Sequence, residues 1–236
     1  MATATVQSIV DRACNELGLP TNSLDPGLID QIGQQSLALV NALGDDILRA
    51  HDWQFLEATA TFVGDGSTSE FDMPADFGRI VNQTTWSTTN RMPMDGPLTA
   101  QQWGWCQFGI VSVGLIYRYR ILGNKLAVFP TPGLGEEIKF YYIKKNWAIA
   151  ANGTTPIDEV TSGAETPLFD RSLMIKGLKA RLWAQKGFDT TALAQEFNDE
   201  LSGYKAQDQG APVLRLAGYW DPLLIDPRRN IPEGNW

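Results

Sequence analysis

Apolar residues recur at helical spacing near the N-terminus of the chain. A first pattern runs from Val6 to Leu17 and ends at Gly18 and Pro20. A second, longer pattern follows Asp25-Pro26, which reads as an N-cap followed by proline at the first helical position, and continues to about His51. Only one stripe of this second helix is apolar, which is typical of a helix that packs on one side.

The apolar period changes to alternation in the middle of the chain. Gly64 to Ser67 reads as a turn, and Gly123-Asn124 as the two-residue loop of a tight hairpin. Thr99 is expected to cap a short helix that reaches about Trp105. Strands are predicted at residues 59–63, 78–86, 115–121, 126–129 and 138–143. The last of these is expected to complete an antiparallel meander.

Helical periodicity returns towards the C-terminus. Thr166-Pro167 repeats the signal of a cap followed by proline and predicts a helix to about Lys186; Asp189 is expected to cap another. The chain is therefore expected to be α+β: a helical bundle made of N- and C-terminal helices, an inserted antiparallel β domain and an extended C-terminal tail. The expected divisions are 1–54 for the N-terminal helices, 55–147 for the β domain, 148–207 for a loop and the helices that complete the bundle, and 208–236 for the tail.

The tail combines two properties that conflict. Four prolines exclude a regular helix or a central strand, yet the segment is too apolar to stay in water. It is expected to bury itself, either on a neighbouring subunit or partner protein or on its own domain. The candidate contact residues are Tyr219, Trp220, Leu223 and Leu224.

The composition, 43% hydrophobic and 19% charged over 236 residues, is that of a globular protein. Apolar runs such as residues 109–116 are too short to span a bilayer, so no membrane association is expected. The N-terminus has no signal-peptide pattern, and the protein is expected to be made in the cytosol. The two cysteines, Cys14 and Cys106, are interpreted as small buried hydrophobes rather than a disulfide or metal ligands.

The net charge of −8 argues against a protein that grips nucleic acid, because phosphate binding needs clustered Lys and Arg. Residues 1–54 carry 7 acids against 2 bases, residues 55–147 carry 8 of each, and residues 148–236 carry 12 against 9. The N-terminal helical arm is therefore the most acidic part, and the β segment is neutral.

No motif indicates catalysis, a cofactor or a metal. His51 is the only histidine, and its place at a helix C-terminus favours a structural role. Adjacent carboxylates on a helix or strand point apart, so only the loop pair Asp158-Glu159 could hold a cation, and solvation is the simpler reading. A small carboxylate-dependent hydrolase is the weakest alternative, because no convergent acid–base set is visible.

An aromatic cluster gives the second alternative. It comprises Trp86, Trp103, Trp105, Phe108 and Tyr117, with Gln101, Gln102 and Gln107 close in sequence. Exposed rings beside amides would suit a carbohydrate-binding tail module. Packing in a core or an interface is favoured, because tryptophans bury large areas and anchor interfaces.

The order of several short segments resembles the head-to-tail adaptor proteins of tailed bacteriophages, also called head-completion or tail-tubular proteins, especially of podovirus-like phages. The matching segments are Trp53-Gln54-Phe55-Leu56 after the long helix, Met73-Pro74-Ala75-Asp76-Phe77, Arg120-Ile121-Leu122-Gly123-Asn124, Phe129-Pro130-Thr131-Pro132 and Tyr141-Tyr142-Ile143. The resemblance covers roughly residues 5–207, and the tail lies outside it.

The resemblance implies a structural virion protein rather than an enzyme. It implies a homo-oligomeric ring, commonly of twelve subunits, that docks beneath the portal protein in the neck of the virion and connects to tail or nozzle proteins. Double-stranded DNA would pass through the ring without specific binding. An acidic lining would suit such a conduit, because it repels phosphates. Asp30, Asp45 and Asp46, on the acid-rich second helix, are the candidate channel-lining residues.

Overall fold

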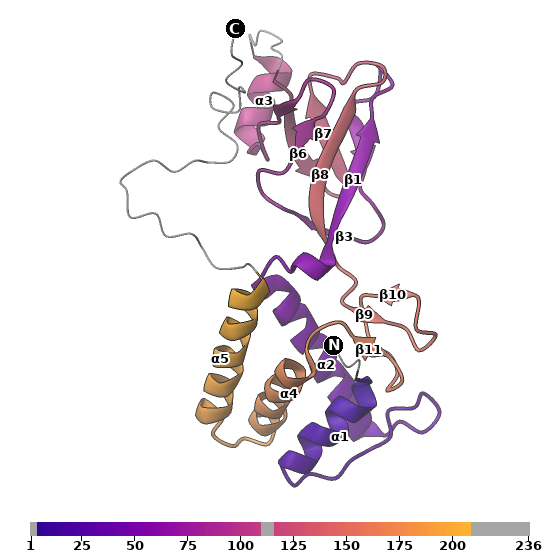
Figure 1. Cartoon of the computed structure of the whole chain (residues 1–236), viewed down its shortest axis with the longest axis vertical. Helices are drawn as coiled ribbons and strands as arrows, with labels where there is room; N and C mark the ends of the chain where they lie inside the picture. The colour runs from indigo at the N-terminus through magenta and orange to yellow at the C-terminus, as the bar shows by residue number, and fades with distance from the viewer. Residues whose placement is uncertain (1–3, 110–115, 209–236) are drawn as a thin grey trace, which may run out of the picture. The chain divides into compact units, whose positions relative to one another are not determined.

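The computed structural model describes residues 4–109 and 116–208, and these divide into two compact units (Figure 1). The helical unit holds residues 4–58, 75–81 and 142–208. The β unit holds residues 59–74, 82–109 and 116–141. Each unit is therefore built from segments that are distant in sequence.

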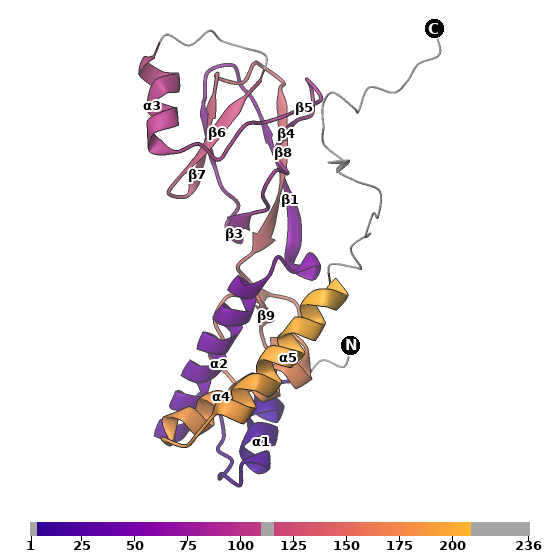
Figure 2. The same ribbon diagram turned by 90° about the vertical axis from the view of Figure 1, so that its left-hand side faces the viewer.

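Four helices and three short strands form most of the helical unit. The helices are α1 (Val6–Glu16), α2 (Gln31–Ala50), α4 (Arg171–Gln185) and α5 (Thr191–Asp208), and the strands β9 (Ala148–Ile149), β10 (Pro156–Ile157) and β11 (Thr166–Pro167) form a small sheet. Helix α4 packs against α1, α2 and α5. Figure 2 shows α2 and α5 on different sides of α4.

Side-chain caps set where two of these helices begin, and both differ from the prediction. Asp30 accepts a hydrogen bond from the Gly33 amide, so α2 begins at Gln31 and is five residues shorter than expected. Asp25 instead begins a turn closed by the Leu28 amide. Helix α4 is capped by Asp170, whereas Thr166-Pro167 forms β11. The predicted starts were wrong because turns and strand ends share the polar-residue-then-proline pattern with helix caps.

Two other predicted starts are confirmed. Thr99 caps α3 (Ala100–Phe108) in a full capping box with Gln102. Asp189 accepts hydrogen bonds from the amide and hydroxyl of Thr191, at the start of α5.

The core of the helical unit is built around Trp147, whose side chain is fully buried. A Cβ on Gly44 of α2 would lie 2.4 Å from Cζ2 of Trp147, so the glycine lets the indole pack against the helix backbone. Phe169 stacks on Trp147 with a centroid distance of 6.0 Å. Trp53 is buried in the same core and donates its indole N–H to the Ile47 carbonyl at 2.8 Å.

The strands outside the small sheet form two antiparallel sheets. Their bounds are β1 (Glu57–Val63), β2 (Glu70–Asp72), β3 (Phe77–Ile80), β4 (Trp86–Ser87), β5 (Met92–Pro93), β6 (Arg118–Leu122), β7 (Lys125–Phe129) and β8 (Glu137–Lys144). One sheet has the order β1-β8-β4-β5, with β3 also paired to β8, and the other has the order β2-β7-β6.

The hairpin prediction is confirmed and the meander prediction is wrong. Leu122 pairs with Lys125 across Gly123-Asn124, and Gly123 supplies the positive φ of 59° that this tight loop requires. However, β8 does not continue from β7, because β7 pairs with β2 and β8 pairs with β1 and β4. The predicted strand 78–86 is interrupted between β3 and β4, where Gln83 has a positive φ of 61°.

The α+β class with antiparallel sheets is confirmed. No helix in residues 4–109 and 116–208 is long and apolar enough to cross a membrane. The predicted extended tail falls outside the described residues from position 209 onwards, as do its four candidate contact residues.

Candidate functional site

The three carboxylates predicted to line a channel have different surroundings on the helical unit. Asp30 caps α2 and also accepts both hydrogen bonds that the Asn22 amide donates, at 3.1 and 2.9 Å. Asp46 forms an ion pair with Arg181 of α4. Asp45 is half-buried and faces a cavity of about 600 Å³. The fold therefore places Asp45 and Asp46 on the same helix but gives only Asp46 a cationic partner among the described residues.

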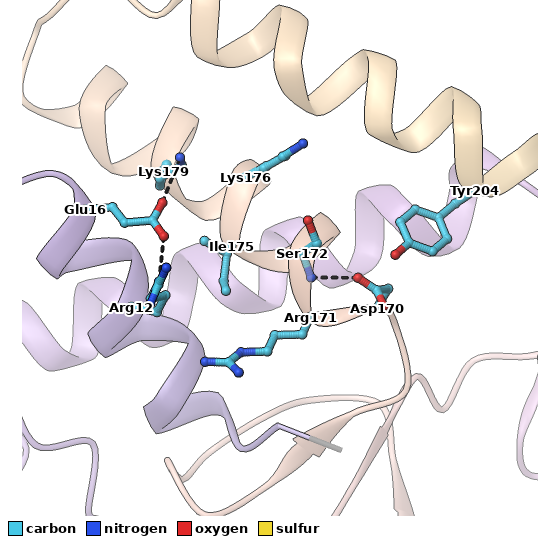
Figure 3. Close-up of a pocket in the computed structure, with 9 residues that line it drawn as sticks. All are labelled: Arg12, Glu16, Asp170, Arg171, Ser172, Ile175, Lys176, Lys179 and Tyr204. Carbon is cyan, nitrogen blue, oxygen red and sulfur yellow. Dashed lines mark hydrogen bonds and ion pairs between the residues drawn. The ribbon is translucent and has the colours of Figure 1, made fainter. Parts of the chain in front are cut away.

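A second cavity, of about 560 Å³, lies among α1, α4 and α5 on the helical unit (Figure 3). We call it the cationic pocket, because four cations and two carboxylates line it together with Ser172, Ile175 and Tyr204. The cations are Arg12, Arg171, Lys176 and Lys179, and the carboxylates are Glu16 and Asp170.

Glu16 holds two of the cations in place. Arg12 donates from Nε to its carboxylate at 2.6 Å, and the Nζ of Lys179 lies 2.9 Å from its other oxygen. The hydrogen bonds from Lys179 and then from Arg12 lower the pKa of Glu16 below its usual 4.5. This carboxylate is therefore ionised at neutral pH and joins α1 to α4.

Lys176 and Tyr204 join α4 to α5 on the other wall of the pocket. The Nζ of Lys176 donates to Glu200 at 2.7 Å, which raises the pKa of the lysine and lowers that of the glutamate. Burial and the neighbouring Asp170 carboxylate both raise the pKa of the Tyr204 hydroxyl. Both walls are thus held by charged contacts between helices.

Arg171 differs from the other cations of the pocket. It is the first residue of α4 and is exposed. Within residues 4–109 and 116–208 it has no ion pair or hydrogen bond from its guanidinium. Figure 3 shows the side chain extending from the start of α4 towards α1. Its five N–H donors are available to an external acceptor.

The cavity beside Asp45 lies on the outer side of α2. Three acids and three bases share its lining, which consists of Asn41, Asp45, Leu48 and Arg49 from α2 together with Gly78, Arg79, Lys145, Asp158 and Glu159. Asn41 holds the loop in place, since its side chain bonds both the amide and the carbonyl of Val160, at 2.8 and 2.9 Å. Asp158 is paired with Lys145 at 2.9 Å, whereas Glu159 is exposed.

His51 has the structural position predicted for it. It is the C-cap of α2, and its ring meets Trp53 edge-on with a centroid distance of 5.0 Å. Its Nε2 lies 3.3 Å from the Asp208 carboxylate, although without hydrogen-bond alignment. The same carboxylate accepts from the Gln54 amide at 3.0 Å, so the end of α5 is fastened to the segment after α2.

The predicted aromatic cluster does not form a buried core. Trp86 and Trp103 are half-buried, but Trp105 and Phe108 on α3 are 68% and 92% exposed. Packing inside the β unit is therefore wrong for these two rings, and they remain available for contact with another molecule.

None of the remaining candidates belongs to a metal-binding cluster in the described part of the chain. Residues 4–109 and 116–208 contain no group of three or more His, Cys, Asp or Glu side chains that could hold a metal ion. Cys14 and Cys106 are free and buried, as predicted, and burial raises the pKa of Cys14.

Sequence reasoning missed the cationic pocket. Its α1 residues lie more than 150 positions before its α4 residues in the chain, and the two helices meet only through folding. One local signal was present: Lys176 and Lys179 are three apart and share a face of α4.

The comparison with family models decides the identity. A model described as SU10 adaptor protein matches residues 4–217, nearly the whole chain. The chain belongs to the SU10 adaptor protein family. Among curated proteins, no sequence matches it.

Membership of the SU10 adaptor family makes this chain a structural protein of a bacteriophage, and the predicted likeness to phage head-to-tail adaptors is confirmed. The family implies association with portal and tail proteins and a location in the neck of the virion. Ion pairs connect the linings of both cavities: Lys179–Glu16 and Lys176–Glu200 join helices around the cationic pocket, and Lys145–Asp158 joins the end of β8 to the loop after β10.

Proposed function

We propose that this SU10 adaptor forms a homo-oligomeric ring, with twelve subunits as the expected number, that docks beneath the portal, extends the DNA channel and connects to the tail. The family match over residues 4–217 is the observation that carries the proposal. The described fold supports it, because a packed helical unit with charged surfaces and a separate β unit provides more than one face for protein contacts.

Asp30, Asp45 and Asp46 are proposed to face or border the channel. Their carboxylates would repel DNA phosphates and let the duplex slide. Of the three, Asp45 should contribute most to this field, because Arg181 offsets Asp46 and Asp30 is engaged at the start of α2. A map of the assembled ring that places all three on its exterior would overturn this part.

Tyr219, Trp220, Leu223 and Leu224 are proposed to contact the portal or an adjacent subunit. The support is compositional: the segment is apolar and rich in proline, as suits an extended chain that adds to a partner surface. A variant that ends at Asp208 should fold, because Asp208 and its contacts with His51 and Gln54 are retained. It should no longer join portal rings; normal joining would rule the tail out.

The experiment that tests the ring mixes the full chain with purified portal and measures particle mass and symmetry by native mass spectrometry and electron microscopy. A discrete ring added to the portal is the expected result. A chain that stays monomeric beside unchanged portal would contradict the proposal.

Carbohydrate binding by α3 is the second candidate, favoured by the exposure of Trp105 and Phe108 beside Gln101 and Gln107. Glycan titration monitored by intrinsic fluorescence tests it. A saturable shift that Trp105→Ala abolishes would support a sugar site, and an unchanged spectrum would remove this candidate.

A further inference from the structure

The two cavities of the helical unit differ in the charges that stay unpaired among the described residues: Arg171 is unpaired at the cationic pocket, and two acids, Asp45 and Glu159, are unpaired beside α2 together with one base, Arg49. The cationic pocket lies among α1, α4 and α5, whereas Asp45 and Glu159 border the cavity on the outer side of α2. We propose that the cationic pocket binds carboxylates on the α2 side of a second copy of this chain, Glu159 foremost, so that neighbouring copies associate head to tail. This inference rests on the proposed ring and names the contact that would close it.

The position of Arg171 is the first argument. A cation at the first residue of a helix is disfavoured by the helix dipole, which is positive at that end. The three other cations of the pocket add further repulsion. An external anion would relieve both, and arginine is the side chain best suited to hold a carboxylate with two parallel hydrogen bonds.

The pocket also retains donors after its internal ion pairs are made. Arg12 reaches Glu16 through Nε, and its side chain is 61% exposed, so its terminal nitrogens remain accessible. Four cations and two carboxylates line the pocket, and Glu200 beside it pairs with Lys176, so one positive charge remains in excess on a chain whose net charge is −8. A carboxylate entering it would meet a favourable local field.

The helix geometry places the acidic partner on the opposite side. Leu43 and Ile47 are buried on the core side of α2. Asn41, Asp45 and Leu48 lie roughly half a turn away on the same helix, because successive residues rotate by about 100°. The cavity beside α2 and the cationic pocket share no lining residue, so one copy could use both at once.

In the described part of the chain, an unpaired cation at one cavity and unpaired carboxylates at a separate one favour a second copy over another kind of ligand. Two different patches that fit each other generate a heterologous contact, and repetition of that contact closes a ring when the rotation allows it. Within the described residues, Glu159 and Asp45 have no cationic partner within 4 Å, whereas Asp158 is already paired with Lys145. Three bases also line that cavity: Arg79 and Lys145 are paired with Asp52 and Asp158, and Arg49 is not paired with any described acid. Glu159 is exposed, whereas Asp45 is half-buried on the same helix as Arg49, so Glu159 is the better test position. In a ring, Asp45 would lie where the subunit contact meets the channel.

Charge reversal tests the contact on the full chain with portal present. Arg171→Glu and Glu159→Lys should each raise the protein concentration needed for half-maximal ring formation by about tenfold or more, because each places like charges against each other. Arg171→Glu should not harm folding, since an acid at the first position of α4 suits the helix dipole. Lys186→Glu, at the other end of the same helix, and Asp25→Lys, in an exposed loop, are the matched controls and should leave ring formation unchanged.

Rescue is the decisive arm. The double variant Arg171→Glu/Glu159→Lys should recover ring formation, and so should an equimolar mixture of the two single variants, because every contact in an alternating ring is then between opposite charges. Single variants that assemble like the unmodified chain would overturn the inference. So would singles that fail without recovery in the double variant and the mixture.

A cross-linking experiment tests the contact between Arg171 and Glu159 independently of ring formation on the portal. Differently tagged chains, one with Arg171→Cys and one with Glu159→Cys, are mixed at high concentration without portal and oxidised. The native cysteines are buried, so a disulfide-linked heterodimer reports the proposed pairing. A heterodimer that forms while no ring forms on the portal would contradict the proposed ring but support the contact between Arg171 and Glu159. Rings that form on the portal without the heterodimer, and with charge variants that assemble normally, would support the ring but contradict this contact.

Discussion

The two units of this adaptor stabilise their interiors in different ways. The helical unit contains one continuous apolar core, and ion pairs such as Lys176–Glu200 and Lys179–Glu16 join its helices outside that core. Both units bury polar side chains: the helical unit buries Ser36 and Glu165, whose side chains bond to residues three or four positions away, and the β unit buries Glu136, Ser87 and Thr85. In the β unit the Glu136 carboxylate bonds Ser87 and Asn90, 49 and 46 positions away in the chain, so a buried polar group joins distant segments there.

Because of this difference, fold stability and the charged surface depend on different residues in the helical unit. In the helical unit the core can hold the fold while the charged surface is free to serve assembly, because exposed ion pairs contribute little to stability. In the β unit the same polar residues that join the loops also hold the interior together. Substitutions of surface charges should therefore be tolerated in the first unit, and substitutions of buried polar residues should be costly in the second.

The largest expected effect is the loss of Trp147 from the helical core. Trp147→Ala should lower the free energy of unfolding by about 3–5 kcal/mol, because it removes a fully buried ring and leaves a cavity. Urea unfolding, followed by hydrogen exchange of peptides from each unit, measures the change. Trp105→Ala, at a ring 68% exposed, is the control and should change stability by less than about 0.5 kcal/mol. Equal losses in the two variants would contradict the picture of one apolar core.

The next effect tests the polar interior of the β unit. Glu136 is 9% exposed and accepts hydrogen bonds from the Ser87 hydroxyl at 2.5 Å and the Asn90 amide at 2.8 Å. Glu136→Ala should destabilise the unit by about 1–3 kcal/mol, because the buried Ser87 hydroxyl loses its acceptor and Asn90 loses its hydrogen bond to the same carboxylate. Hydrogen exchange in β4 and β8 reports the loss. The neighbouring Glu137→Ala removes a half-exposed carboxylate and should cost much less; a reversed order would show that the network is not structural.

Two helix glycines, Gly44 and Gly203, should change stability in opposite directions when replaced by alanine. Alanine normally stabilises a helix interior relative to glycine by about 1 kcal/mol. Gly44→Ala should instead destabilise by about 1–3 kcal/mol, since the added methyl would overlap the Trp147 ring. Gly203→Ala in α5 is the matched control, because nothing lies within 4 Å of its Cβ position, and it should stabilise. Thermal unfolding of both variants checks the prediction, which fails if both shift in the same direction.

The sequence predicted elements better than it predicted their pairing. The α1 pattern, the α3 cap and the Gly123-Asn124 hairpin are local features, set by residues within one turn of each other, and all three are confirmed. The meander was wrong because strand pairing depends on contacts between distant segments. Pairing of β2 with β7 joins residues more than 50 positions apart, and no local pattern encodes it.

The candidate site shows the same limit. The acid-rich character of α2 was visible in the sequence, but the ion pair between Asp46 and Arg181 joins helices 135 positions apart. The cationic pocket likewise exists only when α1, α4 and α5 meet. Charge counts along a chain therefore locate acidic segments, whereas the folded arrangement decides which of those charges remain unpaired.

The smallest expected effect concerns the ion pairs around Glu16 in the helical unit. Its pKa is lowered by Lys179 and Arg12 in the folded state, so its stabilising contribution is fully present above the unfolded pKa of 4.5 and is lost as pH falls through the lower folded pKa. The side chain is 34% exposed, which limits this contribution to at most about 1 kcal/mol. Glu16→Gln should therefore lower stability slightly at pH 7 and converge with the unmodified chain in acid. Urea unfolding at a series of pH values measures the difference in stability, with Asp25→Asn as the control for loss of an exposed carboxylate.

Two outcomes would contradict this prediction. A stability difference that is the same at every pH would mean that packing of the Glu16 side chain, rather than its charge, joins α1 to α4. A difference well above about 1 kcal/mol would show that surface charge stabilises the helical unit as much as buried polar groups stabilise the β unit.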